Sequence, residues 1–134
     1  MSVSITAFYA SLLALFYLYL SGLVIRHRLK EKVALGDGGN RQITQTIRAH
    51  ANFSEYVPLA LILLLVAELN GVDSLWLHGN GALLLVARVF HAIGLRHHYG
   101  TSWQRFSGTV VTFLVLACLA TLNLISVYGL QATA

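Results

Sequence analysis

The feature that most constrains this sequence is a run of 21 residues without a charge, Ile5 to Ile25. A helix of that length crosses the hydrocarbon core of a bilayer, which is about 30 Å thick. No basic residue precedes the run, and Arg26, His27 and Arg28 follow it as a stop-transfer group. A cleaved signal peptide would carry its basic residues in front instead. We therefore expect this segment to remain as a membrane-spanning helix.

Three further apolar stretches follow, and short polar connections separate them. The composition fits a membrane protein, since 57% of the residues are hydrophobic and 10% are charged, whereas soluble domains are about 25% charged. Short connections between consecutive spans make neighbouring helices antiparallel. We predict an all-α fold: an integral membrane antiparallel four-helix bundle that forms one domain over residues 1–134, with helices at about 5–25, 45–69, 74–95 and 106–128.

The basic residues indicate the orientation of this bundle. All nine lie in or beside the loop joining the first and second helices or the loop joining the third and fourth: Arg26, Arg28, Lys30, Lys32, Arg41, Arg48, Arg88, Arg96 and Arg105. The positive-inside rule predicts that both loops are cytoplasmic and that the termini face the opposite side. Because this distribution accounts for the net charge of +4 without a separate basic domain, we expect no nucleic-acid partner.

A stripe of polar side chains opens the second helix. Arg48, Asn52 and Glu55 are spaced four and three residues apart, so they share one helix face. Tyr56 follows, and residues 56–67 carry no charge. Ionisable groups that lead into a membrane are costly and mark functional sites by default. The alternative is that Arg48 and Glu55 are structural partners across a helix interface.

Antiparallel packing brings further polar groups to the same end of the bundle. Arg26 and Arg28 close the first helix, Arg88 and His91 form an i, i+3 pair near the end of the third, and Arg105 opens the fourth. The alternative for Arg26 and Arg28 is that they anchor the helix at the lipid headgroups. The sequence offers no set of metal ligands at fixed spacing, so we expect no metal site here.

Residues 48–59, RAHANFSEYVPL, resemble the second-helix motif of the membrane-associated proteins in eicosanoid and glutathione metabolism (MAPEG). That family includes microsomal glutathione transferases, the inducible microsomal prostaglandin E synthase and the cysteinyl-leukotriene synthase. The Asn-x-x-Glu-Tyr-x-Pro pattern is most similar to the leukotriene branch. Residues 87–91, ARVFH, resemble the third-helix Arg-x-x-His of the prostaglandin branch.

The resemblance implies a homotrimer that binds glutathione as co-substrate between neighbouring subunits, at the cytoplasmic boundary of the membrane. Arg105 would match the arginine assigned to thiol activation, although the preceding loop differs in length here. Family enzymes carry a tyrosine about one turn after His91, where this chain has Leu95. The glutathione-binding residues implied by position are Arg26, Arg28, Arg48, Asn52, Glu55, Tyr56, Arg88 and His91.

Two functions remain open at this point. The first is glutathione S-transferase or peroxidase activity on a hydrophobic electrophile that enters from the membrane lipid; Arg105 favours it. The second is a non-enzymatic protein that binds or presents lipid, a type that the family also contains; Leu95 favours it. A transporter would need charged groups near the midplane and inverted repeats, and neither is evident. The resemblance is to a bacterial-type member, which favours a bacterial inner membrane over the endoplasmic reticulum.

Overall fold

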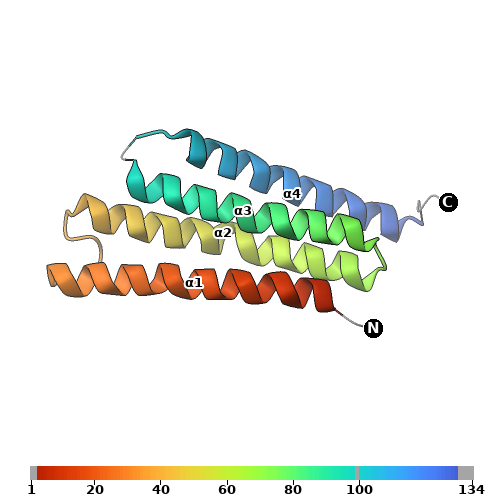
Figure 1. Ribbon diagram of the computed structural model, residues 1–134, viewed down its shortest axis with the longest axis horizontal. Helices are drawn as coiled ribbons and strands as arrows, with labels where there is room; N and C mark the ends of the chain where they lie inside the picture. The colour runs from red at the N-terminus through yellow and green to blue at the C-terminus, as the bar shows by residue number, and fades with distance from the viewer. Residues whose placement is uncertain (1–2, 99, 130–134) are drawn as a thin grey trace.

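A computed structural model describes residues 3–98 and 100–129, and it shows four long helices, each antiparallel to the one before it (Figure 1). They are α1 (Ser4–Glu31), α2 (Arg41–Leu69), α3 (Ser74–His97) and α4 (Trp103–Val127). The central pair is α2 and α3, because each of them contacts the other three helices, whereas α1 and α4 do not contact each other among the described residues. The expected all-α fold with four helices is confirmed.

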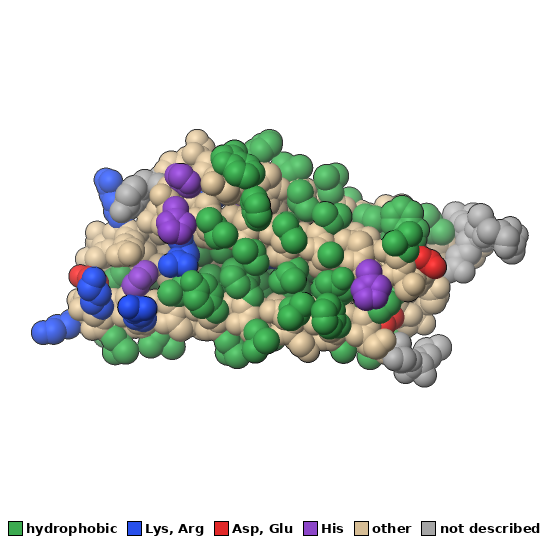
Figure 2. Space-filling model, viewed as in Figure 1, with side chains coloured by type: hydrophobic (Ala, Val, Ile, Leu, Met, Phe, Trp, Pro, Cys, Tyr) green, Lys and Arg blue, Asp and Glu red, His purple; other side chains and the backbone are tan. Residues whose placement is uncertain are grey.

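Three of these helices, α1, α2 and α4, are long and apolar enough to cross a membrane among the residues that the structure describes. Hydrophobic side chains cover much of the surface along the middle of the bundle, as expected where lipid surrounds it (Figure 2). The α3 helix has a similar length but carries Asn80, Arg88 and His91, which are all buried inside the bundle. Its polar residues therefore face other helices, and the prediction of a fourth span rests on its packing between its neighbours.

The helices extend beyond the predicted apolar spans at the end where the basic loops lie. The first helix continues from the expected end at residue 25 to Glu31. It stops at Lys32, which has a left-handed backbone, and the Val33 amide closes the turn by donating to the Arg28 carbonyl over 2.9 Å. Apolarity marks the length inside the hydrocarbon, but a helix can continue into the headgroup layer, where polar side chains are tolerated.

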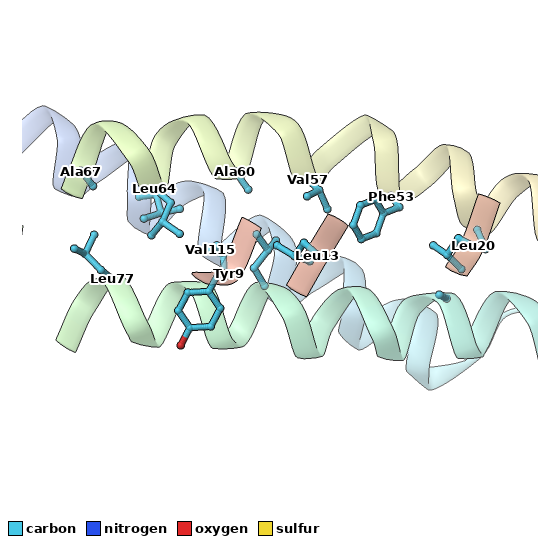
Figure 3. Packing of buried hydrophobic residues seen from close by; sticks show 14 of the residues in the cluster. Tyr9, Leu13, Leu20, Phe53, Val57, Ala60, Leu64, Ala67, Leu77 and Val115 are labelled. Carbon is cyan, nitrogen blue, oxygen red and sulfur yellow. The ribbon is translucent and has the colours of Figure 1, made fainter. Parts of the chain in front are cut away.

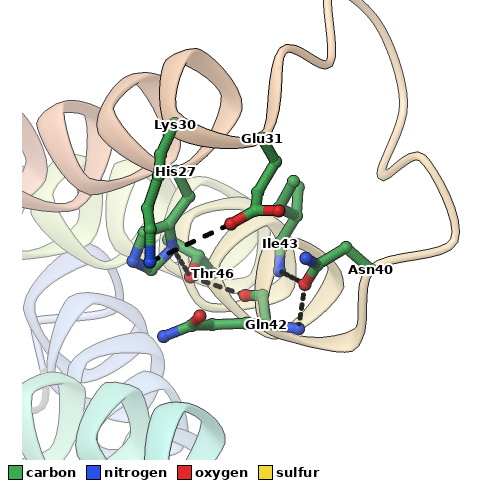
Figure 4. A network of polar contacts seen from close by, with 7 residues as sticks. All are labelled: His27, Lys30, Glu31, Asn40, Gln42, Ile43 and Thr46. Atoms are coloured by element: carbon green, nitrogen blue, oxygen red, sulfur yellow. Dashed lines mark hydrogen bonds and ion pairs between the residues drawn. The ribbon is translucent and has the colours of Figure 1, made fainter.

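The second helix begins at Arg41 because Asn40 caps it. The Asn40 Oδ1 accepts hydrogen bonds from the amides of Gln42 and Ile43 at 2.9 and 3.3 Å (Figure 4). An asparagine cap satisfies amides that have no partner within the helix. In the same region, His27 Nδ1 lies 2.9 Å from Thr46 Oγ1, which links the end of α1 to the start of α2.

The apolar core fills the space between the central pair and α1. Leu13 and Leu20 of α1 and Leu64 of α2 are almost completely buried, and Val57 and Val115 pack in the same cluster (Figure 3). This cluster runs along most of the length of the bundle, from Ala67 and Leu77 near one end to Ala49 and Leu95 toward the other.

At the end opposite the basic loops, a carboxylate of α2 caps α1. The helix begins at Ser4 with no side-chain cap of its own and no acidic residue in its first turn. Instead, the Glu68 carboxylate accepts hydrogen bonds from the amides of Ile5 and Thr6 at 2.9 and 2.7 Å. A negative charge at this position also stabilises the helix dipole.

Candidate functional site

The centre of the candidate site is the buried guanidinium of Arg88 on α3. Only 1% of this residue is exposed. Its guanidinium donates to Asn52 Oδ1 of α2 and, over 3.3 Å, to Thr112 Oγ1 of α4. It also lies 5.8 Å from the centre of the Tyr56 ring. One cation thus links three helices at the basic end of the bundle, with no carboxylate in direct contact among the described residues.

The polar stripe of α2 extends this cluster toward the surface. Arg48 and Glu55 form an ion pair at 3.7 Å, and about half of each side chain is exposed. Asn52 uses its amide nitrogen to donate to Glu55 Oε2 over 3.5 Å, while its oxygen accepts from Arg88. The prediction that Arg48, Asn52 and Glu55 share one face is confirmed. The row of contacts runs from an exposed ion pair to a buried cation, and we call it the Arg88 cluster.

Arg105 lies outside the Arg88 cluster and close to His91. Both line a hollow of about 280 Å³ between the end of α3 and the start of α4. The two helices approach closely here, because a Cβ added at Gly108 would lie 2.8 Å from the Cβ of His91, and one at Gly94 would lie 2.9 Å from the Cγ of Arg105. The Arg105 guanidinium donates to the Gly100 carbonyl over 2.8 Å, so it points toward its own loop.

The two arginines at the end of α1 are not joined to the Arg88 cluster by any contact of the described residues. Arg26 is exposed, and Arg28 lines a separate hollow beside the end of α1. The side chain between them, His27, contacts α2 instead. The roles of Arg26 and Arg28 in glutathione binding stay predictions.

Thr112 is a member of the cluster that sequence reasoning missed. It is fully buried, and its hydroxyl donates to the Gly108 carbonyl while it accepts from Arg88. A threonine within an apolar helix usually bonds its own backbone, so the residue type alone did not indicate a place in the site. Its spacing did indicate such a place, because Thr112 stands seven residues after Arg105 and therefore on nearly the same helix face.

Comparison with known proteins shows which family the chain belongs to. The sequence model of the MAPEG family matches residues 6–125, which is most of the chain. The chain belongs to the MAPEG family. It is 38% identical over 120 residues to the inner membrane protein YecN of Escherichia coli K12, with 90% of each chain covered. The protein of the same name from Escherichia coli O6:H1 matches to the same extent.

This membership and the apolar helices together define where the MAPEG chain resides. Three helices can cross a membrane among the described residues, and the E. coli relatives are inner membrane proteins. The chain is a multi-pass protein of a bacterial inner membrane. The cytoplasmic orientation of the basic loops follows from the charge distribution and stays a prediction.

One position separates this MAPEG chain from the expected enzyme pattern. Leu95, where a tyrosine was expected, is 8% exposed and packs with the apolar core. It lies one turn after His91, whose Nδ1 is buried without a partner among the described residues. The position therefore offers packing to the site but no hydroxyl group.

Proposed function

We propose that this protein is a membrane-embedded, glutathione-dependent transferase or peroxidase that acts on hydrophobic electrophiles. The observation that carries the proposal is the Arg88 cluster, which holds a buried cation next to an exposed carboxylate at the basic end of the bundle. A buried cation without a carboxylate partner favours an anionic ligand, because an uncompensated charge is costly inside a protein.

The functional groups of glutathione complement this cluster. Glutathione has two carboxylates, one ammonium group, two amides and a thiol. Arginine pairs with carboxylates through two parallel hydrogen bonds, which suits Arg48, whose side chain is about half exposed. Arg88, whose terminal nitrogens already donate to Asn52 and Thr112, would attract the second carboxylate through its charge. Glu55 would receive the ammonium group, and Asn52 would bond an amide. Binding would exchange the ion pair between Arg48 and Glu55 for two pairs with the ligand, so little net charge would be left unpaired.

Arg105 is the proposed thiol-activating residue. It lies at the start of α4, where the helix contributes about half a positive charge, and a guanidinium near sulfur favours the thiolate, which is the nucleophile. Within one subunit Arg105 bonds Gly100 in its own loop. We therefore place it in a site shared between subunits of a homotrimer, with the hydrophobic electrophile entering from the lipid. His91 and Tyr56 would complete the contacts of the bound peptide.

The test is the ionisation of bound glutathione. We expect thiolate ultraviolet absorbance when the purified protein is mixed with glutathione at a pH below about 8, where free thiols stay mostly protonated. Arg105→Ala should abolish that absorbance and lower turnover far more than binding, because Arg105 would interact with charge on the sulfur. Arg96→Ala is the matched control, since Arg96 lies in the last turn of α3, on the other side of the loop that precedes Arg105, but donates to Tyr19 on α1.

The second candidate is a lipid-binding protein without catalysis, which the apolar packing of Leu95 favours. Glutathione binding without a thiolate band, or no glutathione binding at all, would reject the enzyme and favour this alternative.

A further inference from the structure

A second hollow lies outside the Arg88 cluster, where the chain reverses after α1. It has a volume of about 440 Å³ and combines two cationic with four apolar side chains: Ile25, Arg28, Leu29, Lys32, Val33 and Ala34. Several basic side chains gather at this end of the bundle (Figure 2). We call this hollow the α1-end hollow. Its mixture of charge and apolar surface is not that of a solvent-facing loop.

The backbone at Lys32 is unusual. Its φ angle is 56°, and it is the one residue other than glycine with a positive φ among those that the structure describes. Helices commonly end with a left-handed residue, and glycine fills this position most easily because it has no Cβ. A lysine here is strained, and such strain concentrates at functional sites.

The two cations of this hollow form no ion pair with a carboxylate of the residues that the structure describes. Glu31 pairs with Lys30 at 4.0 Å instead. Asp37 accepts hydrogen bonds from the Gly39 amide at 3.0 Å and the Thr44 hydroxyl at 2.8 Å, and these bonds hold its pKa below the usual value. Among the described residues, no carboxylate pairs with Arg28 or Lys32, and the Arg28 Nε is buried without a hydrogen-bond partner. An anion from outside the chain would neutralise both cations and give the Arg28 Nε a hydrogen-bond partner.

The depth of the hollow identifies the source of that anion. At 1.5 Å per residue, the helix from Ser4 to Ile25 is roughly 33 Å long, which is about the thickness of the hydrocarbon core. Arg28 and Lys32 follow within two turns and so lie at the level of the lipid phosphates. Ile25 and Leu29, on the same side, are 59% and 75% exposed, which suits contact with an acyl chain.

We propose that the α1-end hollow binds an anionic phospholipid, with its phosphate between Arg28 and Lys32 and an acyl chain along Ile25 and Leu29. This use of Arg28 does not depend on the proposed catalytic function. It assigns the Arg28 side chain to lipid rather than to glutathione, which Arg88 and Arg48 would bind.

The test measures lipid retention on the purified protein by native mass spectrometry. The wild type, released from micelles that contain equal amounts of phosphatidylglycerol and phosphatidylcholine, should retain phosphatidylglycerol preferentially. Arg28→Gln, Lys32→Gln and Lys32→Gly should each lower this preference by about fivefold, the typical effect of one cation at a membrane surface. Lys30→Gln is the matched control. It removes an equal charge two residues from both Arg28 and Lys32, and the Lys30 side chain is already paired with Glu31.

Lys32→Gly separates a lipid site from a structural role. Glycine relieves the strained turn, so its thermal unfolding midpoint in phosphatidylcholine alone should equal or exceed that of the wild type while lipid preference falls. Three results would overturn the proposal. The first is no lipid preference in the wild type, and the second is an equal loss of preference in Lys30→Gln, which would indicate diffuse attraction. The third is displacement of the lipid by an equal concentration of inorganic phosphate, which would indicate a site for free anions.

Discussion

The hydrogen bond between Arg88 and Asn52 can be measured by a double-mutant cycle. Arg88→Met replaces the guanidinium with an apolar chain of similar length, and Asn52→Leu removes the acceptor. Hydrogen bonds to charged groups contribute about 1.5–3 kcal/mol. Arg88 is 1% exposed, so water cannot replace the bond, and we expect a coupling free energy of about 2 kcal/mol between the two positions. Arg88→Met alone can be nearly neutral, because it also removes a buried charge. Asn52→Leu alone should be destabilising, because it leaves the buried guanidinium with one partner fewer.

The free energy of unfolding of all four proteins can be followed by tryptophan fluorescence during titration of mild-detergent micelles with a denaturing detergent. Thr112→Val combined with Arg88→Met is the internal comparison, and its coupling should be smaller because the Thr112 bond is longer, at 3.3 Å. A coupling of less than about 0.5 kcal/mol between Arg88 and Asn52 is within the range of independent sites. That result would refute the conclusion that the bond between Arg88 and Asn52 holds the centre of the site together.

Three further predictions concern single features of the chain. Glu55→Gln should weaken glutathione binding by about 2–4 kcal/mol in isothermal titration while trimer assembly survives; loss of assembly with unchanged binding would make Glu55 a structural partner. Glu68→Gln should lower the free energy of unfolding by about 1 kcal/mol, because one acceptor oxygen remains but the charge at the start of α1 is lost; an unchanged value contradicts the cap. Single cysteines at Ser4 and Gly39, in a Cys118→Ala background, should react with an impermeant reagent from opposite sides of the membrane, and labelling from one side would reject the orientation.

The parts of the site that sequence could predict are those within one helix. Residues three or four apart in a helix are neighbours whatever surrounds them, so the contact of Asn52 with Glu55 followed from spacing. Arg48 stands two turns before Glu55, so spacing predicted that the two share a face. Contacts between helices depend on how each helix is rotated about its axis. The pairing of Arg88 with Thr112 needed that information, and an apolar helix carries little of it.

The end of α1 illustrates most clearly what could not be predicted from the sequence. Because α1 is apolar on all sides over residues 5–25, its sequence does not indicate which side faces the bundle. Arg26 and Arg28 were both candidates for the site, yet the side chain that contacts α2 is His27. The direction of Arg105 was equally hidden, because a single carbonyl at Gly100 determines it.

The contact between Glu68 and the start of α1 has a consequence for how the chain is made. The hydrogen-bonded residues are 62 and 63 positions apart in sequence, so the first helix emerges during synthesis before the group that caps it exists. Its leading amides receive their partner only when α2 has crossed back to the same side. The bond also sets the register of the pair, since sliding one helix past the other by a single turn, about 5.4 Å, would separate donor and acceptor. The first two helices thus form a hairpin, and the Glu68 contact fixes its register only once the second helix is complete.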